Sequence, residues 1–173
     1  GIELPMHDPR FNPGLARKYQ YDPTPARHVK GGYPIPYGNQ PPEVKYNYEN
    51  SAEVDLAGII DVELTNAGGF CKFGEEFALP PDMRARYLTA ITGFDYNNQE
   101  ETDRFGIRAF TIRHAFNLRE GFRRKDFDVS RRALGDPPLK EGPTAGRTID
   151  NERLADNLFR KLGWNLADAV PTK

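Results

Sequence analysis

The length, composition and charge of the chain exclude several kinds of protein. Its 173 residues include 24 Lys and Arg against 25 Asp and Glu, which gives a net charge of −1. Neither positive nor negative charge is confined to one half of the chain, so the composition argues against a protein that binds nucleic acid or an acidic membrane over its whole surface. The sequence contains no run of about 18 apolar residues that could cross a bilayer. One cysteine cannot close a disulfide within the chain, and low cysteine usage predicts a cytoplasmic protein.

Residues 1–50 are predicted to form an irregular, loop-rich segment. Their start, "GIELPMHDPR", lacks an initiator Met and a secretion signal, so we expect a piece of a longer protein. Pro, Gly, Tyr and Asn recur in "HDPRFNPG", "YDPTPARH" and "KGGYPIPYGNQPPE", and the prolines forbid helix through much of this stretch. Only "GLARKYQY" can form a short helix. Because disordered segments are usually poorer in aromatic residues, we expect an ordered segment that lies on a surface or lines a site.

Residues 51–173 are predicted to form a helical domain, beginning with a helix over about 51–66. Asn50 and Glu53 have the spacing of a capping box, and apolar residues follow at helical spacing. These apolar residues are Val54, Ala57, Ile60 and Leu64. The helix should end near Asn66 to Gly69, because Asn and Gly tolerate the left-handed conformation that closes helices.

Three further helices are predicted from their caps and periodicity. One starts at "PPD" and stops at Gly93, with Met83, Tyr87, Leu88 and Ile91 at helical spacing. The longest, over about 98–119, has acids early and arginines late, and its predicted apolar stripe is Phe105, Ala109, Ile112 and Phe116. A last helix is capped by Asp150 and ended by Gly163, with Leu154, Leu158 and Leu162 directed inward. Strand signals are almost absent, so the predicted fold is mainly α, with long Pro- and Gly-rich loops.

The lone cysteine, Cys71 in "TNAGGFCKFG", allows two interpretations. Unpaired cysteines are often small packed core residues. Alternatively, Gly68 and Gly69 allow close approach of the backbone and leave N–H groups free to point at a thiolate or sulfide, as an iron-sulfur ligand needs. A four-iron cluster requires four thiolates, so three would come from outside this chain.

Other polar residues also have both a structural and a functional interpretation. His28, in "TPARHVKGG", is either a surface histidine bonded to its own loop or a group that exchanges protons near neutral pH. Lys30 is either a solvated loop lysine or a contact to a phosphate or pterin. "MHDPR" indicates a turn rather than a metal site. The basic "FNLREGFRRK" indicates a solvated helix end or a surface that docks an acidic partner or an anion.

Four phrases, in this order, carry a resemblance to a known family: "GIELPMHDPR", "YDPTPARH", "NAGGFCKFG" and "AFNLREGFRRKD". They are closed by "LFRKLGWNLADAVPTK". Over nearly its whole length, the chain resembles the C-terminal part of the tungsten-containing aldehyde ferredoxin oxidoreductase family. The resemblance implies the C-terminal helical portion of a larger multidomain enzyme. In that family, an N-terminal β-rich domain forms the base for two pterin dithiolenes that hold tungsten or molybdenum.

The resemblance also implies roles for five residues. Cys71 matches the fourth ligand of a 4Fe-4S cluster, whose other ligands lie upstream in a CxxCxxxC motif. His28 matches an active-site histidine that exchanges a proton near the metal, and Lys30 matches a pterin-contacting lysine. Asn66 stands where the family has a pterin-binding Asp, and Phe70 stands where it has Leu. An amide can still hydrogen-bond to a pterin, but it cannot supply the charge of a carboxylate.

The implied reaction is oxidation of an aldehyde to a carboxylic acid, with electrons leaving through the cluster to ferredoxin or another electron-transfer protein. "DPTPARH" looks closer to relatives that include the tungsten subunit of benzoyl-CoA reductases, so reduction of an aryl thioester or another carboxylate-level molecule is an alternative. A third is a non-catalytic helical interaction module. Further expected partners are the N-terminal domains of the same enzyme, with a homodimer left open. We expect the isolated chain to be inactive and to bind no cofactor.

Overall fold

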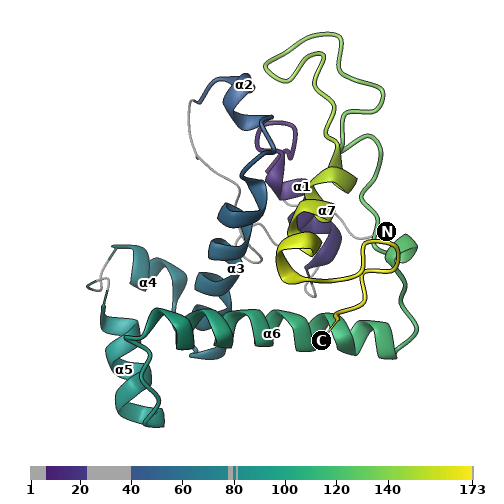
Figure 1. Ribbon diagram of the computed structural model, residues 1–173. Helices are drawn as coiled ribbons and strands as arrows, with labels where there is room; N and C mark the ends of the chain where they lie inside the picture. The colour runs from purple at the N-terminus through teal and green to yellow at the C-terminus, as the bar shows by residue number, and fades with distance from the viewer. Residues whose placement is uncertain (1–6, 23–39, 78–79, 81, 173) are drawn as a thin grey trace.

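The computed structural model describes residues 7–22, 40–77, 80 and 82–172, and it is built from helices (Figure 1). In chain order these are α1 (Gly14–Tyr21), α2 (Pro42–Lys45), α3 (Ser51–Ala67), α4 (Lys72–Phe77), α5 (Met83–Thr92), α6 (Gln99–Arg119), the 3-10 helix η1 (Arg124–Asp126) and α7 (Asn151–Leu162). Extended pairing in these ranges is limited to one isolated bridge between Trp164 and Pro171. The prediction of a mainly α fold is confirmed. None of the helices described here is long and apolar enough to span a membrane.

α3 is the central helix of the packing, and the longest helix is α6. It runs along the base of the molecule in Figure 1, with α3 rising from it and α5 projecting below it near one end. α3 contacts both α6 and α7, and α1 contacts α7. The main hydrophobic cluster collects side chains from α1, α3, α6, α7 and the C-terminal segment, and its largest members are Tyr21, Ile59, Phe110, Leu158, Phe159 and Trp164.

The inward leucines predicted for α7 are confirmed, whereas the predicted apolar stripe of α6 lies only partly against the core. In α7, Leu154 and Leu158 are buried and Leu162 packs against the main cluster. In α6, the buried residues are Gly106, Phe110 and His114. In the predicted stripe, the side chains of Ile112 and Phe116 are 61% and 53% exposed, whereas Phe105 and Ala109 are half-buried.

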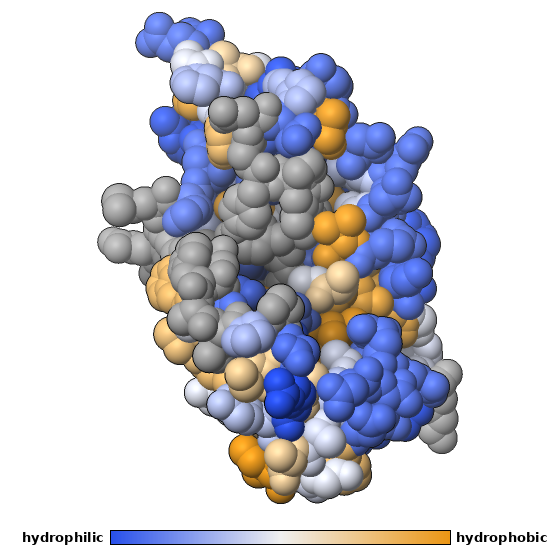
Figure 2. Space-filling model, turned by 90° about the vertical axis from the view of Figure 1, so that its left-hand side faces the viewer, coloured by the Kyte–Doolittle hydropathy of each residue, from blue (hydrophilic) through white to orange (hydrophobic). Residues whose placement is uncertain are grey.

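The stripe of α5 also remains at the surface, and that of α3 divides between core and solvent. None of the α5 residues is buried, and Ile91 is 81% exposed. Figure 2 views the side of the molecule that carries α4 and α5 and shows apolar residues at its lower end. In α3, Ile60 and Leu64 are buried, whereas Ala57 is exposed. The periodicity therefore located α5 and α6 correctly but did not identify which of their faces packs.

Two predicted helix caps have different outcomes. Asp150 caps α7, since its carboxylate accepts a hydrogen bond from the Arg153 N–H at 3.1 Å. The capping box at Asn50 is wrong: its side chain makes no capping bond, and its φ of −103° and ψ of 16° differ from the extended conformation that a capping residue normally adopts. The start of α3 is instead held by Ser51, whose hydroxyl donates to the Tyr48 carbonyl at 2.9 Å.

The helix predicted from "GLARKYQY" forms as α1, but it does not lie on the surface. All eight of its residues are buried, including Arg17 and Lys18. Arg17 forms a buried ion pair with Asp55 of α3, which satisfies two charges that would otherwise be costly to bury. Burial and the neighbouring Arg17 charge lower the pKa of Lys18 to about 7. The Arg17–Asp55 ion pair thus fixes α1 against α3 inside the molecule.

Candidate functional site around Cys71

The stretch before Cys71 ends α3 in a Schellman motif. The Phe70 N–H donates to the Thr65 carbonyl at 2.9 Å, and the Gly69 N–H lies 3.4 Å from the Asn66 carbonyl. Gly69 has a φ of +73°, a conformation that other residues adopt at a cost. The helix therefore ends where the sequence predicted, and its last carbonyls are satisfied by the chain just before the cysteine.

The other glycine of the pair, Gly68, is needed for packing rather than for the turn. A Cβ added to Gly68 would lie 2.6 Å from Cε2 of the Phe70 ring, so a larger residue would displace that ring. Phe70 is half-buried in this position. The two glycines thus have separate effects: Gly69 turns the chain, and Gly68 makes room for Phe70.

Cys71 follows this turn directly and precedes α4. Its thiol group is free and the residue is exposed. The Cys71 carbonyl accepts a hydrogen bond from the Glu75 N–H at 3.0 Å, which fixes the first turn of α4. An exposed thiol does not fit the interpretation of Cys71 as a packed core residue. It is consistent with a ligand presented to something beyond the described residues.

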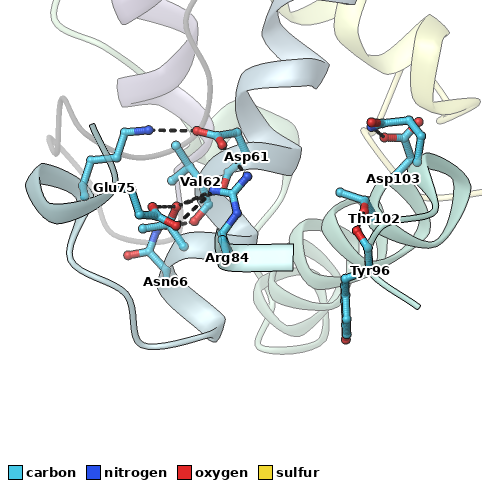
Figure 3. A network of polar contacts seen from close by, with 11 residues as sticks. Asp61, Val62, Asn66, Glu75, Arg84, Tyr96, Thr102 and Asp103 are labelled. Atoms are coloured by element: carbon cyan, nitrogen blue, oxygen red, sulfur yellow. Dashed lines mark hydrogen bonds and ion pairs between the residues drawn. The ribbon is translucent and has the colours of Figure 1, made fainter. Parts of the chain in front are cut away.

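Asn66 lies on the same turn and faces solvent. Its amide nitrogen donates to the Val62 carbonyl at 2.7 Å, within α3 (Figure 3). This bond holds the amide on the helix surface and uses part of its donor capacity. Asn66, Phe70 and Cys71 are therefore brought together by one short turn, at the end of α3 and the start of α4.

A polar network that the sequence did not reveal joins α3, α4 and α5 beside this turn (Figure 3). Asp61 of α3 accepts a hydrogen bond from Lys72 Nζ at 2.8 Å and pairs with Arg84 Nη2 at 2.7 Å. Thr65 donates its hydroxyl to a Glu75 carboxylate oxygen at 2.6 Å. Arg84 Nη1 donates to Thr65 Oγ1 at 3.0 Å and lies 3.4 Å from Glu75 Oε1.

The charges of the network are balanced and affect Asp61 most clearly. Burial alone would raise the pKa of the Asp61 carboxyl, but hydrogen bonds and positive charge from Lys72 and Arg84 outweigh this and hold the pKa below its ordinary value. The only sequence signal was the spacing of Asp61 and Thr65, which places them on one face of α3. Nothing local could predict that Arg84 would reach both.

Comparison with known proteins agrees with this architecture. All 173 residues match the family model described as "Aldehyde ferredoxin oxidoreductase, domains 2 & 3". The chain belongs to the aldehyde ferredoxin oxidoreductase family. It is also 26% identical, over 98% of its length, to the "Tungsten-containing aldehyde ferredoxin oxidoreductase" of Pyrococcus abyssi (strain GE5 / Orsay). The chain spans 28% of the length of this curated relative.

Two of the residues assigned by resemblance to the aldehyde ferredoxin oxidoreductase family cannot be placed. His28 and Lys30 lie outside the described residues, so their roles stay predictions. Within the described ranges, His, Cys, Asp and Glu form no group of three or more that could hold a metal ion. The turn expected from "MHDPR" forms from Asp8 onward, because the Asp8 carboxylate accepts from the Arg10 N–H at 2.9 Å.

The basic "REGFRRK" of this family member is only partly solvated. Arg124 is 17% exposed, and it pairs with Glu152 and, at 2.8 Å, with Asp156, both on α7. Its guanidinium also lies over the Phe159 ring, 5.5 Å from the centroid. The interpretation of this segment as a solvated helix end is therefore wrong for Arg124, which ties η1 to α7. Arg119 and Arg123 are exposed.

Proposed function

We propose that the chain is the helical portion of an oxidoreductase that uses a tungsten or molybdenum pterin cofactor to oxidise an aldehyde to a carboxylic acid. In this proposal, Cys71 supplies one thiolate to a 4Fe-4S cluster, and electrons leave through the cluster to ferredoxin or another electron-transfer protein. The observation that carries the proposal is the exposed thiol, held at a rigid turn in a chain of this family.

The residues present fit one part of such a site. A four-iron cluster takes four cysteine thiolates, and this chain has a single cysteine, so three ligands would come from elsewhere. Asn66 lies beside the thiol with its amide in solvent, where it could hydrogen-bond to a pterin edge. When bound, the metal pterin and the cluster would supply two-electron chemistry and single-electron transfer, respectively.

The chain itself would provide ligation, orientation and proton exchange. The Schellman turn and α4 hold the Cys71 backbone in place, so the thiolate would be oriented before the cluster binds. His28 would accept a proton released on oxidation of the aldehyde, since its ordinary pKa lies near neutrality. Lys30 would contact the pterin. These last two roles rest on the family resemblance alone.

The test uses the full-length enzyme that contains this chain. We expect Cys71→Ser to lower the iron content and to remove or change the electron paramagnetic resonance (EPR) signal of the reduced cluster. Ala90→Ser, which introduces the same hydroxyl at an exposed position of α5, is the matched control and should leave both unchanged. Unaltered iron content and electron transfer in Cys71→Ser would refute the proposal. Assays with aldehydes and with aryl thioesters would separate oxidation from the reductase alternative.

A further inference from the structure

Three tethers fix the main chain around Cys71 to α3. The residue before it is held by the bond from the Phe70 N–H to the Thr65 carbonyl, at 2.9 Å. The residue after it is held by the 2.8 Å ion pair between Lys72 and Asp61. One helical turn later, Glu75 accepts the Thr65 hydroxyl at 2.6 Å while its own N–H holds the Cys71 carbonyl. Thr65 and Asp61, one turn apart on α3, thus anchor both sides of the cysteine.

Arg84 of α5 is the group that joins these tethers. One of its guanidinium nitrogens pairs with Asp61 at 2.7 Å, and the other donates to Thr65 Oγ1 at 3.0 Å and lies 3.4 Å from Glu75. The same nitrogen also lies 3.2 Å from the Asp61 carbonyl oxygen. A planar guanidinium can make these contacts at once, whereas an ammonium acts as a single point charge. Arg84 therefore links an acid of α3 to an acid of α4.

The two parts of this network differ in how far they are exposed to solvent. The side chains of Lys72 and Asp61 are 38% and 41% exposed, so their ion pair is screened and stabilises the fold little. Glu75 is only 11% exposed and Arg84 22%, so the part nearest α4 is the better shielded. The screened Lys72–Asp61 pair and the shielded Arg84–Glu75 pair lie on the two sides of an exposed thiol, so together they are suited to restricting its movement.

We propose that Arg84 is a positioning residue for Cys71, acting through Asp61, Thr65 and Glu75 to hold the thiol in one orientation. The purpose of this positioning rests on the proposed function, in which the thiolate must meet a cluster bound by other parts of the enzyme. The restriction of movement itself does not depend on the proposed function. It can be measured in the 173-residue chain without any metal.

The single cysteine provides a direct probe, because a nitroxide label can attach only at Cys71. We expect labelled Arg84→Met to give an EPR spectrum in which more of the nitroxide is mobile and less is immobilised than in the parent. The control, Arg86→Met, removes the exposed 3.6 Å pair with Asp82 on the same helix and should match the parent. Arg84→Lys should be intermediate, since one ammonium cannot serve both acids. Spectra of Arg84→Met and Arg84→Lys that match the parent would overturn the proposal.

Two further measurements separate positioning from loss of the fold. Amide exchange at Phe70 and Glu75 should accelerate by about tenfold in Arg84→Met, as expected for easier local opening, while amides of α7 keep their protection. Unchanged exchange at both amides would count against the proposal. In the full-length enzyme, Arg84→Met should shift the cluster potential. If the label becomes mobile in Arg84→Met but the reduction potential of the cluster is unchanged, only the role of Arg84 toward the cluster is refuted. If the iron content of Cys71→Ser is unaltered, the proposed function is refuted and the positioning result still holds.

Discussion

Replacement of Gly106 by alanine tests how closely α3 and α6 approach. A Cβ on Gly106 would lie 2.6 Å from the Ile60 Cα and 2.9 Å from its Cβ and Cγ1. Carbon atoms pack best at about 3.5–4.0 Å, so the helices must separate by about 1 Å. The nearest atom belongs to the backbone of α3 and cannot rotate away. The separation would loosen the neighbouring core contacts of Ile59 and Phe110.

The expected loss of stability in Gly106→Ala is the difference between two opposing effects. Overpacking of this kind costs about 2–3 kcal/mol, whereas alanine is better than glycine inside a helix by about 1 kcal/mol. Gly106→Ala should therefore lower the free energy of unfolding by about 1–2 kcal/mol, or the Tm by about 2–8 °C for a chain of this size.

Thermal and urea unfolding monitored by circular dichroism measure this loss. The control is Gly74→Ala in α4, where the added Cβ would meet Cys71 Cβ at an ordinary 3.5 Å. That variant should be as stable as the parent or slightly more stable, because only the propensity term remains. If Gly106→Ala is no less stable than the parent, the close crossing of the two helices is refuted.

Two further predictions concern the buried charges of α1. Asp55→Ala removes the carboxylate paired with buried Arg17 and should cost about 3–5 kcal/mol in urea unfolding, whereas a loss below about 1 kcal/mol would contradict a buried pair. Burial lowers the pKa of Lys18 from 10.5 to about 7, so between these values the unfolded chain binds more protons and the free energy of unfolding should rise with pH. The rise is at most about 1.4 kcal/mol per pH unit. Lys18→Met should remove it, and equal slopes for parent and variant between pH 7 and 9 would refute the assignment.

Helix boundaries could be predicted from the sequence because their signals are local. The helix expected over about 51–66 runs from Ser51 to Ala67, and the one expected over about 98–119 runs from Gln99 to Arg119. Gly93 and Gly163, which follow α5 and α7, adopt the positive φ that ends these helices. These features depend on a few neighbouring residues, so no tertiary information was needed.

The candidate site could be predicted only in part, for the opposite reason. The turn at Gly69 and the place of Cys71 after it follow from neighbouring residues. The contacts of Arg84 with Asp61 and Glu75 join three helices, and the sequence gives no sign of which arginine of α5 would make them. Arg86, two residues later, pairs only with Asp82 among the ion pairs of the described residues. The difference between the two arginines depends on how α5 lies against α3, which is a property of packing.

The error in the α6 stripe has a specific physical cause in the same packing. The predicted stripe contains Phe105, Ala109, Ile112 and Phe116, and it is more apolar than the face of Gly106, Phe110 and His114. A rule that buries the most apolar face of a helix therefore selects the predicted stripe. The structure selects the face of Gly106, Phe110 and His114, because only a glycine allows α3 to cross with Ile60 so close. His114 fits there because its ring stacks on Trp164 at 4.6 Å and its Nε2 bonds the Ala169 carbonyl at 2.8 Å. Close approach and a satisfied polar group thus decided the orientation of α6, and Ile112 and Phe116 were left facing outward.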